Sequence, residues 1–255
     1  MENTKIPLNI FQTWHSLDLP PKMKETVELL KSQNPEFTHY LYDDSMCREF
    51  IKINFNDDIL YSYDSLKPGA YKADLWRYCV LYKYGGIYLD IKFQCANGFK
   101  LINFTDNEYY VKDIPQFNIF PGIYQAFLIC LPNNKILFDN ICRIILNCKT
   151  CNYDVICALD VTGPTLMAKN FDLNQFNNLF LKNTGTSIIN SKNNDVEILI
   201  EYEEYRDELN IYKKTEHYGE LWAKQDIYNI LQPRKFLIDS FISCNKCSDN
   251  DVSDK

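Results

Sequence analysis

The stretch of residues 68–86, PGAYKADLWRYCVLYKYGG, constrains the fold of this chain more than any other. Its apolar residues recur at helical spacing, so a helix is predicted over Pro68–Tyr84. The pair Gly85-Gly86 supplies the stop signal at the end of that helix. The apolar run Ile87–Ile91 follows at once and predicts a buried strand that contains one acid, Asp90.

Predicted strands and helices alternate along the rest of the chain. The predicted strands are Ile6–Trp14, His39–Tyr42, Tyr109–Val111, Tyr124–Leu131 and Val196–Ile200, and the predicted helices are Lys22–Ser32, Ser45–Ile53 (N-capped by Asp43 or Asp44), Lys135–Asn147 and one that opens after Gly163-Pro164. This alternation predicts an α/β layered domain. No repeat or linker interrupts it, so we expect one domain over residues 1–243 and a polar, disordered tail over residues 244–255.

Composition narrows the class of protein. With 255 residues and 46% hydrophobic residues, the chain can bury a substantial core. The net charge is −7 and Lys and Arg form no run, which argues against a nucleic-acid partner. No apolar run approaches the roughly 20 residues of a transmembrane helix, and the N-terminus lacks the pattern of a signal peptide. We therefore expect a soluble, cytoplasmic protein.

The chain is rich in Asn, Ile and Lys and poor in Gly and Ala. This bias is typical of AT-rich genomes, so we expect a source such as a giant virus or a low-GC microbe. For a viral protein, the expected location is the host cytoplasm or the virion.

Ten cysteines include two Cys-x-x-Cys pairs, Cys148–Cys151 and Cys244–Cys247. Two such pairs form a zinc site when they meet in space. The alternative is that they are free thiols in a reducing compartment, because a chain of this size needs no disulfides.

Asp74, Arg77 and Asp90 are the candidates for chemistry. Asp74 and Arg77 share one helix face, and their simplest interpretation is an exposed ion pair that adds little stability. Asp90 lies within the predicted buried strand, near its carboxyl end. A carboxylate there needs a cation, a metal or a hydroxyl as a partner, and ligands of α/β sheets bind beyond the carboxyl ends of strands.

The run AD-xx-RY-xx-LY-x-YGGIYLD resembles the DXD sugar-binding region of glycosyltransferase family 32, which includes fungal initiating mannosyltransferases, and the glucosyltransferase domain of large clostridial toxins. Further elements that are similar to this family are Ile6-Pro7 with Gln12-Thr13-Trp14, Asn34-Pro35, Asp43-Asp44, Thr162-Gly163-Pro164, and His217 with Trp222. The resemblance thus extends from about Ile6 to Trp222.

This resemblance implies a GT-A-type nucleotide-sugar-binding fold, with a mixed, mostly parallel sheet flanked by helices. It also implies a retaining glycosyltransferase that moves a sugar from a nucleotide-diphosphate-sugar donor to a glycan or glycoprotein acceptor. The implied donor-binding residues are Gln12, Trp14, Asp74, Arg77, Gly163, Pro164 and Trp222, the implied catalytic residues are Asp90 and Lys92, and the implied metal ligands are Asp90 and His217.

Individual roles follow from the same resemblance. Trp14 would stack on the nucleotide base, although a core Trp is the alternative. Asp74 and Arg77 would bind hydroxyls of the donor sugar. His217 and Trp222 would close over the diphosphate.

Two positions depart from the family pattern. Lys92 stands where the second DXD acid is expected, and Leu221 where a Ser precedes the Trp. A divalent metal, Mn²⁺ or Mg²⁺, is the cofactor expected of the family, and Lys92 makes that metal doubtful here. If Asp90 and Lys92 lie on one strand, their side chains are two residues apart and face the same side, so the ammonium pairs with Asp90 or with the diphosphate. Alternatively, the strand has ended and Lys92 points to solvent.

Two hypotheses compete with an active glycosyltransferase. One is a catalytically inactive nucleotide-sugar-binding protein, and the other is a scaffold without a ligand.

Overall fold

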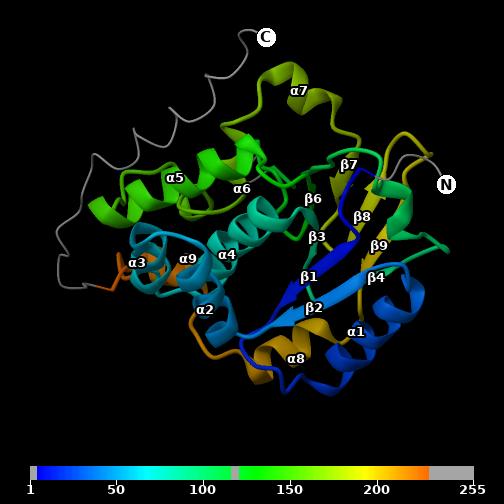
Figure 1. Ribbon diagram of the computed structural model, residues 1–255, viewed down its shortest axis with the longest axis horizontal. Helices are drawn as coiled ribbons and strands as arrows, with labels where there is room; N and C mark the ends of the chain where they lie inside the picture. Colours follow the sequence, from blue (N-terminus) through cyan, green and yellow to red (C-terminus); the bar gives the residue numbers. More distant parts are fainter. Residues whose placement is uncertain (1–4, 116–120, 230–255) are drawn as a thin grey trace, which may run out of the picture.

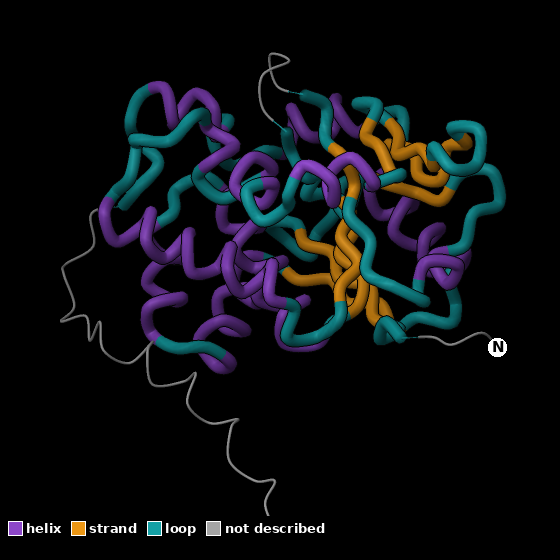
Figure 2. Tube along the Cα trace, turned by 90° about the horizontal axis from the view of Figure 1, so that it is seen from above, coloured by secondary structure: helices purple, strands orange, loops and turns teal. Residues whose placement is uncertain are grey.

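The protein contains two sheets, and most of its helices lie to one side of β1, β2 and β3, opposite the strands β7, β8 and β9 (Figure 1). The computed structural model describes residues 5–115 and 121–229. Figure 2 shows the strands as two separate groups, with most of the helices beside the first sheet. The predicted tail and the Cys244–Cys247 pair lie outside the described residues, so the predicted domain limits and the zinc site stay predictions.

The first sheet has the strand order β2-β1-β3-β6. Its strands are β1 (Asn9–Thr13), β2 (Thr38–Tyr42), β3 (Gly86–Leu89) and β6 (Phe127–Cys130). Strand β1 pairs parallel with β2 and β3, and β6 pairs antiparallel with β3. The predicted fold class, α/β with a mixed, mostly parallel sheet flanked by helices, is confirmed.

The second sheet was not predicted. Its order is β4-β9-β8-β7-β5, and its pairs are antiparallel except β5 with β7. The strands are β4 (Phe93–Cys95), β5 (Val111–Lys112), β7 (Leu181–Asn183), β8 (Ser187–Asn190) and β9 (Val196–Glu201). Only β9 and part of β5 fall inside predicted strands, because segments of two to four residues carry too little alternation to be recognised.

Nine α-helices lie within the described residues. They are α1 (Pro21–Gln33), α2 (Asp44–Asn54), α3 (Asp57–Ser65), α4 (Gly69–Tyr84), α5 (Lys135–Thr150), α6 (Pro164–Ala168), α7 (Leu173–Asn178), α8 (Tyr205–Tyr212) and α9 (Tyr218–Ala223). Each predicted helix is present, and Asp43 caps α2 by accepting the Met46 amide. None of the nine is long and apolar enough to cross a bilayer.

Helix α4 is buried on all its sides. Every residue from Leu75 to Leu81 is buried, because α2, α3, α5 and α9 pack around the helix and β1 and β3 lie against it. The interpretation of Asp74 and Arg77 as an exposed pair is therefore wrong: the two residues are 8% and 6% exposed. Apolar side chains from Leu75 to Leu81 point in all directions around α4, as expected of a helix in a core.

The Gly85-Gly86 turn fixes β3 against β1. Both glycines have positive φ values, 61° and 117°. A Cβ atom on Gly86 would lie 2.7 Å from the carbonyl oxygen of Asn9, and one on Gly85 would lie 2.6 Å from Pro132. Only glycine allows this backbone conformation and this close approach.

Strand β3 ends at Leu89, one residue earlier than Asp90 and three earlier than Lys92. Asp90 therefore lies just beyond the strand rather than within it, and Lys92 lies in a turn. The prediction that Asp90 and Lys92 lie on one strand and face the same side is wrong, because the chain bends after Leu89 to enter β4.

Candidate functional site

A buried cluster of charged side chains lies at the carboxyl end of β3. The Arg77 guanidinium contacts Asp74 Oδ1 through Nη1 at 2.9 Å and Asp90 Oδ1 through Nη2 at 3.7 Å. Arg77 Nη1 also donates to the Gln125 carbonyl at 3.0 Å. One cation thus lies between two carboxylates, so the structure brings together three of the residues predicted for the site.

Neighbouring residues hold this cluster in place. The Tyr88 ring stacks under the guanidinium, 4.4 Å from its carbon, and the Tyr88 hydroxyl donates to Asp90 Oδ1 at 2.8 Å. The Thr162 hydroxyl donates to Asp74 Oδ2 at 2.7 Å. Gly163 follows at close range, since a Cβ there would lie 3.2 Å from Asp74 Oδ2. This places the predicted Gly163 and Pro164 beside Asp74.

The cluster leaves hydrogen-bonding capacity free. Both oxygens of Asp74 are engaged, and Arg77 Nε is buried without a partner among the described residues. Asp90 has a side chain that is 30% exposed, and Oδ1 is the oxygen that its neighbours contact. A half-open carboxylate beside a fixed guanidinium can accept from a hydroxyl of a ligand.

Burial and charge shift the pKa values of the cluster. Burial raises the pKa of Asp74, while Arg77 and Thr162 oppose that rise. Burial opposes the charge on Arg77, but Tyr88, Asp74 and Asp90 outweigh it and raise the pKa of the guanidinium. Arg77 therefore stays a cation at any pH at which the protein is folded.

Gln12 joins the site from β1. It is fully buried, its Oε1 lies 2.7 Å from His39 Nε2, and its Nε2 reaches the Asp90 carbonyl at 3.5 Å. Gln12 thus positions the backbone of Asp90, and His39 positions Gln12.

Acidification should destabilise the protein through His39. Burial lowers the pKa of His39 to about 4 from the ordinary 6.5. Between these values the unfolded chain binds a proton that the folded protein does not, so stability falls as the pH falls from about 6.5 towards 4. We expect the His39 contribution to cost about 2 kcal/mol at pH 5. Urea unfolding at pH 7 and pH 5 should show a smaller loss in His39→Gln, and equal losses in both proteins would contradict this.

The three other predicted site residues, Trp14, His217 and Trp222, have different surroundings. Trp14 is half-buried against the cluster of Met23, Val27, Ile91 and Tyr202. Within the part of the chain that the structure describes, the indole Nε1 atoms of Trp14 and Trp222 are buried without a partner. His217 is exposed and caps α9, accepting the Gly219 amide at 3.2 Å.

Lys92 is neither paired with Asp90 nor directed to solvent. Its ammonium contacts Glu201 Oε2 of β9 at 3.0 Å, and the two side chains are 9% and 5% exposed. The rings of Phe93, Tyr124 and Tyr205 surround the ammonium at 5.0–5.7 Å. Lys92 thus ties the turn after Asp90 to the second sheet.

The described residues do not form a metal site by themselves. No group of three or more His, Cys, Asp or Glu side chains among them is placed to hold an ion. Asp90 offers one carboxylate, and the ammonium of Lys92 offers no oxygen. The donor set therefore does not fit a metal held by these residues alone.

Sequence reasoning missed several residues of this region. Tyr88 and Thr162 contact the cluster directly, and Asp113 lies beside Pro164 across Gly122. Tyr88 stood inside the recognised run, so its side chain could have been assigned. Asp113 is a lone acid in an irregular stretch, and nothing in its spacing marks it.

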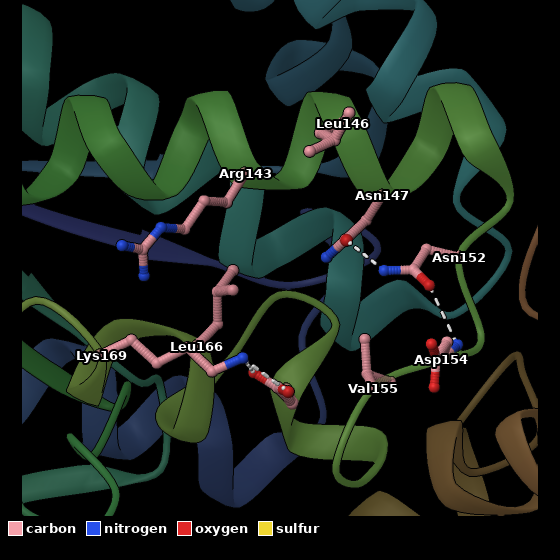
Figure 3. Close-up of a pocket in the computed structure, with 9 residues that line it drawn as sticks. Arg143, Leu146, Asn147, Asn152, Asp154, Val155, Leu166 and Lys169 are labelled. Carbon is pink, nitrogen blue, oxygen red and sulfur yellow. Dashed lines mark hydrogen bonds and ion pairs between the residues drawn. The ribbon is translucent and has the colours of Figure 1, made fainter.

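A pocket of about 240 Å³ lies behind the loop that carries Thr162, between α5 and α6 (Figure 3). Asn147 donates to the Val161 carbonyl and accepts from Asn152, both at 2.9 Å. Asp160 and Lys169 form an ion pair at 2.6 Å. These groups pair with one another, and none of the predicted site residues lines the pocket, so it supports the loop from behind.

Part of the chain matches a known protein family. Residues 20–111 match the family described as "Glycosyltransferase sugar-binding region containing DXD motif". This segment contains α4, Asp74, Arg77, Asp90 and Lys92. The predicted resemblance to the DXD glycosyltransferases is thereby confirmed, and the α/β architecture agrees with the GT-A-type fold that the resemblance implies.

Individual relatives are fungal and viral. Inositol phosphoceramide mannosyltransferase 3 of Schizosaccharomyces pombe is 36% identical over 94 residues, which is 37% of this chain and 26% of that protein. An uncharacterized glycosyltransferase of Acanthamoeba polyphaga mimivirus is 31% identical over 141 residues, 53% of this chain and 54% of that protein. The matches thus span between about a quarter and about half the length of these two relatives.

Two solved structures resemble about two thirds of the chain, at low sequence identity. The PaToxG glycosyltransferase has a TM-score of 0.49 and 15% identity, covering 65% of this chain and 69% of that one. The catalytic domain of alpha-toxin from Clostridium novyi has a TM-score of 0.40 and 10% identity, covering 66% and 63%.

Proposed function

We propose that this protein is a retaining glycosyltransferase that transfers a sugar from a nucleotide-diphosphate-sugar donor to a glycan or glycoprotein acceptor. The observation that carries the proposal is the Asp74–Arg77–Asp90 cluster, buried at the end of β3 within the segment that matches the DXD family. Charged groups are seldom buried without a structural or binding role, because removing them from water is costly.

Each residue of the cluster has a part in this proposal. Arg77 donates to hydroxyls of the donor sugar, and its pairing with Asp74 fixes the guanidinium in one orientation. Asp90 accepts from a hydroxyl of the donor through the oxygen that its neighbours leave free. Tyr88 and Thr162 keep the two carboxylates from turning away. Such fixed polar groups bind without reorganising, which is what a transferase needs.

The surrounding residues complete the donor site in the same proposal. Trp14 stacks on the nucleotide base, and its unpartnered indole nitrogen lies in the same region of the chain as Gln12. Gly163 and Pro164 contact the sugar beside Asp74. His217 and Trp222 close over the diphosphate from α9.

The names of the relatives suggest where to begin with the donor. The fungal relatives include Inositol phosphoceramide mannosyltransferase 3 and the Initiation-specific alpha-1,6-mannosyltransferase of Candida albicans, which is 29% identical over 96 residues. Mannose donors are therefore the first to test.

The experiment is a donor panel. Purified protein is incubated with GDP-mannose, UDP-glucose, UDP-galactose and UDP-N-acetylglucosamine, each with and without EDTA, and release of the nucleoside diphosphate is measured. We expect hydrolysis of at least one donor. Stabilisation by a donor without turnover would instead indicate the inactive sugar-nucleotide-binding protein, since a ligand that binds only the folded state raises the melting temperature. If no donor is hydrolysed and no donor stabilises the protein, the proposed function is contradicted.

A further inference from the structure

We propose that Asp113 binds a hydroxyl of the acceptor sugar, on the side of the donor site that lies away from the nucleotide. This inference rests on the proposed function and deepens it, because it assigns the acceptor side to a residue that neither the sequence pattern nor the family match singles out. Asp113 lies outside the matched segment of residues 20–111.

Sheet topology puts Asp113 at the same edge as Asp90. Asp90 follows β3, and its amide donates to the Ala126 carbonyl just before β6 at 2.8 Å. Asp113 follows β5, and its amide donates to the Gly122 carbonyl at 2.9 Å. The bridges Tyr109↔Ile129 and Lys112↔Ile123 show that the β5 segment runs beside the β6 segment towards that edge.

The order of the strands then separates the two substrates. Trp14 follows β1, Asp90 follows β3, and Asp113 follows β5, which lies beside the segment of β6. Side chains that follow adjacent strands at one edge are arranged in the order of those strands. A donor with its base at Trp14 and its sugar at Asp90 therefore has Asp113 on the far side of the sugar, where an acceptor must approach.

The Asp113 carboxylate is held by one oxygen and presents the other. Oδ1 accepts from the Ile114 amide and from Asn183 Nδ2, both at 2.8 Å. No hydrogen bond to Oδ2 occurs among the residues that the structure describes. The side chain is half-buried, so its orientation is fixed by Asn183 rather than by solvent.

Gly122 brings Asp113 close to the predicted donor site. A Cβ atom at Gly122 would lie 3.1 Å from the Cβ of Asp113 and 3.3 Å from that of Pro164. Glycine at this position therefore lets Asp113 and Pro164 pack closely on the two sides of its backbone. A carboxylate beside the donor site can accept from a substrate hydroxyl.

Asp113 and the acids of the cluster affect the pKa values of the same two tyrosines. Burial raises the pKa of Tyr124, and Asp90 and Asp113 raise it further. Burial likewise raises the pKa of Tyr218, to which Asp74 and Asp113 both contribute. Each tyrosine therefore lies within reach of Asp113 and of one acid of the cluster.

The test separates transfer from hydrolysis in Asp113→Asn. The acceptors are the methyl glycosides of mannose, glucose, galactose and N-acetylglucosamine, with the donor that the wild-type protein hydrolyses. We expect Asp113→Asn to raise KM for the best acceptor at least tenfold and to leave donor hydrolysis within twofold of wild type. A structural role alone would lower both rates together. Asp139→Asn, which removes a carboxylate that pairs with the exposed Lys135 on α5, is the matched control.

A second variant guards against misfolding. Asn183→Ala removes one of the two donors to Asp113 Oδ1 and should shift the acceptor KM in the same direction by a smaller factor. Unchanged acceptor KM in both variants, or equal losses of transfer and hydrolysis, would overturn the assignment of Asp113. Hydrolysis by wild type without transfer to any methyl glycoside would also overturn it. Failure of wild type to hydrolyse any donor would instead count against the proposed function itself.

Discussion

Replacing Arg77 with Ala should destabilise the protein by about 3–5 kcal/mol and abolish donor turnover. The substitution leaves Asp74 and Asp90 facing each other without the cation between them, and Asp74 is buried. Removing one partner of a buried ion pair costs this much because the remaining charge is left without compensation. Urea unfolding gives the first effect, and release of nucleoside diphosphate gives the second.

Arg48→Ala is the matched control for this experiment. Arg48 also makes a two-point ion pair, with Asp64 at 2.7 Å for both contacts, but its side chain is 45% exposed. An exposed pair of this kind contributes about 1 kcal/mol or less. Equal losses of stability in the two variants would show that burial of the Arg77 cluster has no energetic consequence.

Lys92→Met should be the second most damaging substitution, with a loss of about 3 kcal/mol of unfolding free energy. Among the residues that the structure describes, the exposed Arg206 is then the remaining cationic partner of the Glu201 side chain, which is 5% exposed. A buried carboxylate that loses its cation is costly for the reason given for Arg77. Thermal and urea unfolding measure the loss.

The double variant Lys92→Met/Glu201→Gln tests what Lys92 does. It removes both charges, so we expect stability to return to within about 1–2 kcal/mol of wild type. If Lys92 acts only through the stability of the fold, donor hydrolysis should return as well. Restored stability without hydrolysis would show that Lys92 itself contributes to turnover, by positioning the turn after Asp90 or by the direct contact with the diphosphate that the sequence suggests.

Long, strongly patterned segments were predictable from the sequence. The helix before Gly85-Gly86, the strands β1 and β3 and the cap at Asp43 all follow from local residue patterns. The second sheet was not predictable, because its strands β4, β5, β7 and β8 are short and gain their stability from pairing with segments distant in the chain.

The identity of the site residues was more predictable than their surroundings. Asp74, Arg77 and Asp90 were recognised, and they do lie together. The burial of Asp74 and Arg77 was not foreseen, because spacing on one helix does not show what packs against the other faces. Glu201, the partner of Lys92, is more than a hundred residues away in sequence, so no local pattern could indicate it.

Because α4 is buried on all sides, the segment that matches the family needs the rest of the chain in order to fold. Residues 20–111 exclude β1 and β6, which flank β3, and exclude α5 and α9, which cover α4. A fragment cut at these limits would expose the buried and mostly apolar residues from Leu75 to Leu81 and should aggregate rather than fold. In the intact protein, the amide hydrogens of this stretch should exchange with deuterated solvent only when the whole domain opens. The sugar-binding region is thus a unit of sequence similarity and not an autonomous folding unit.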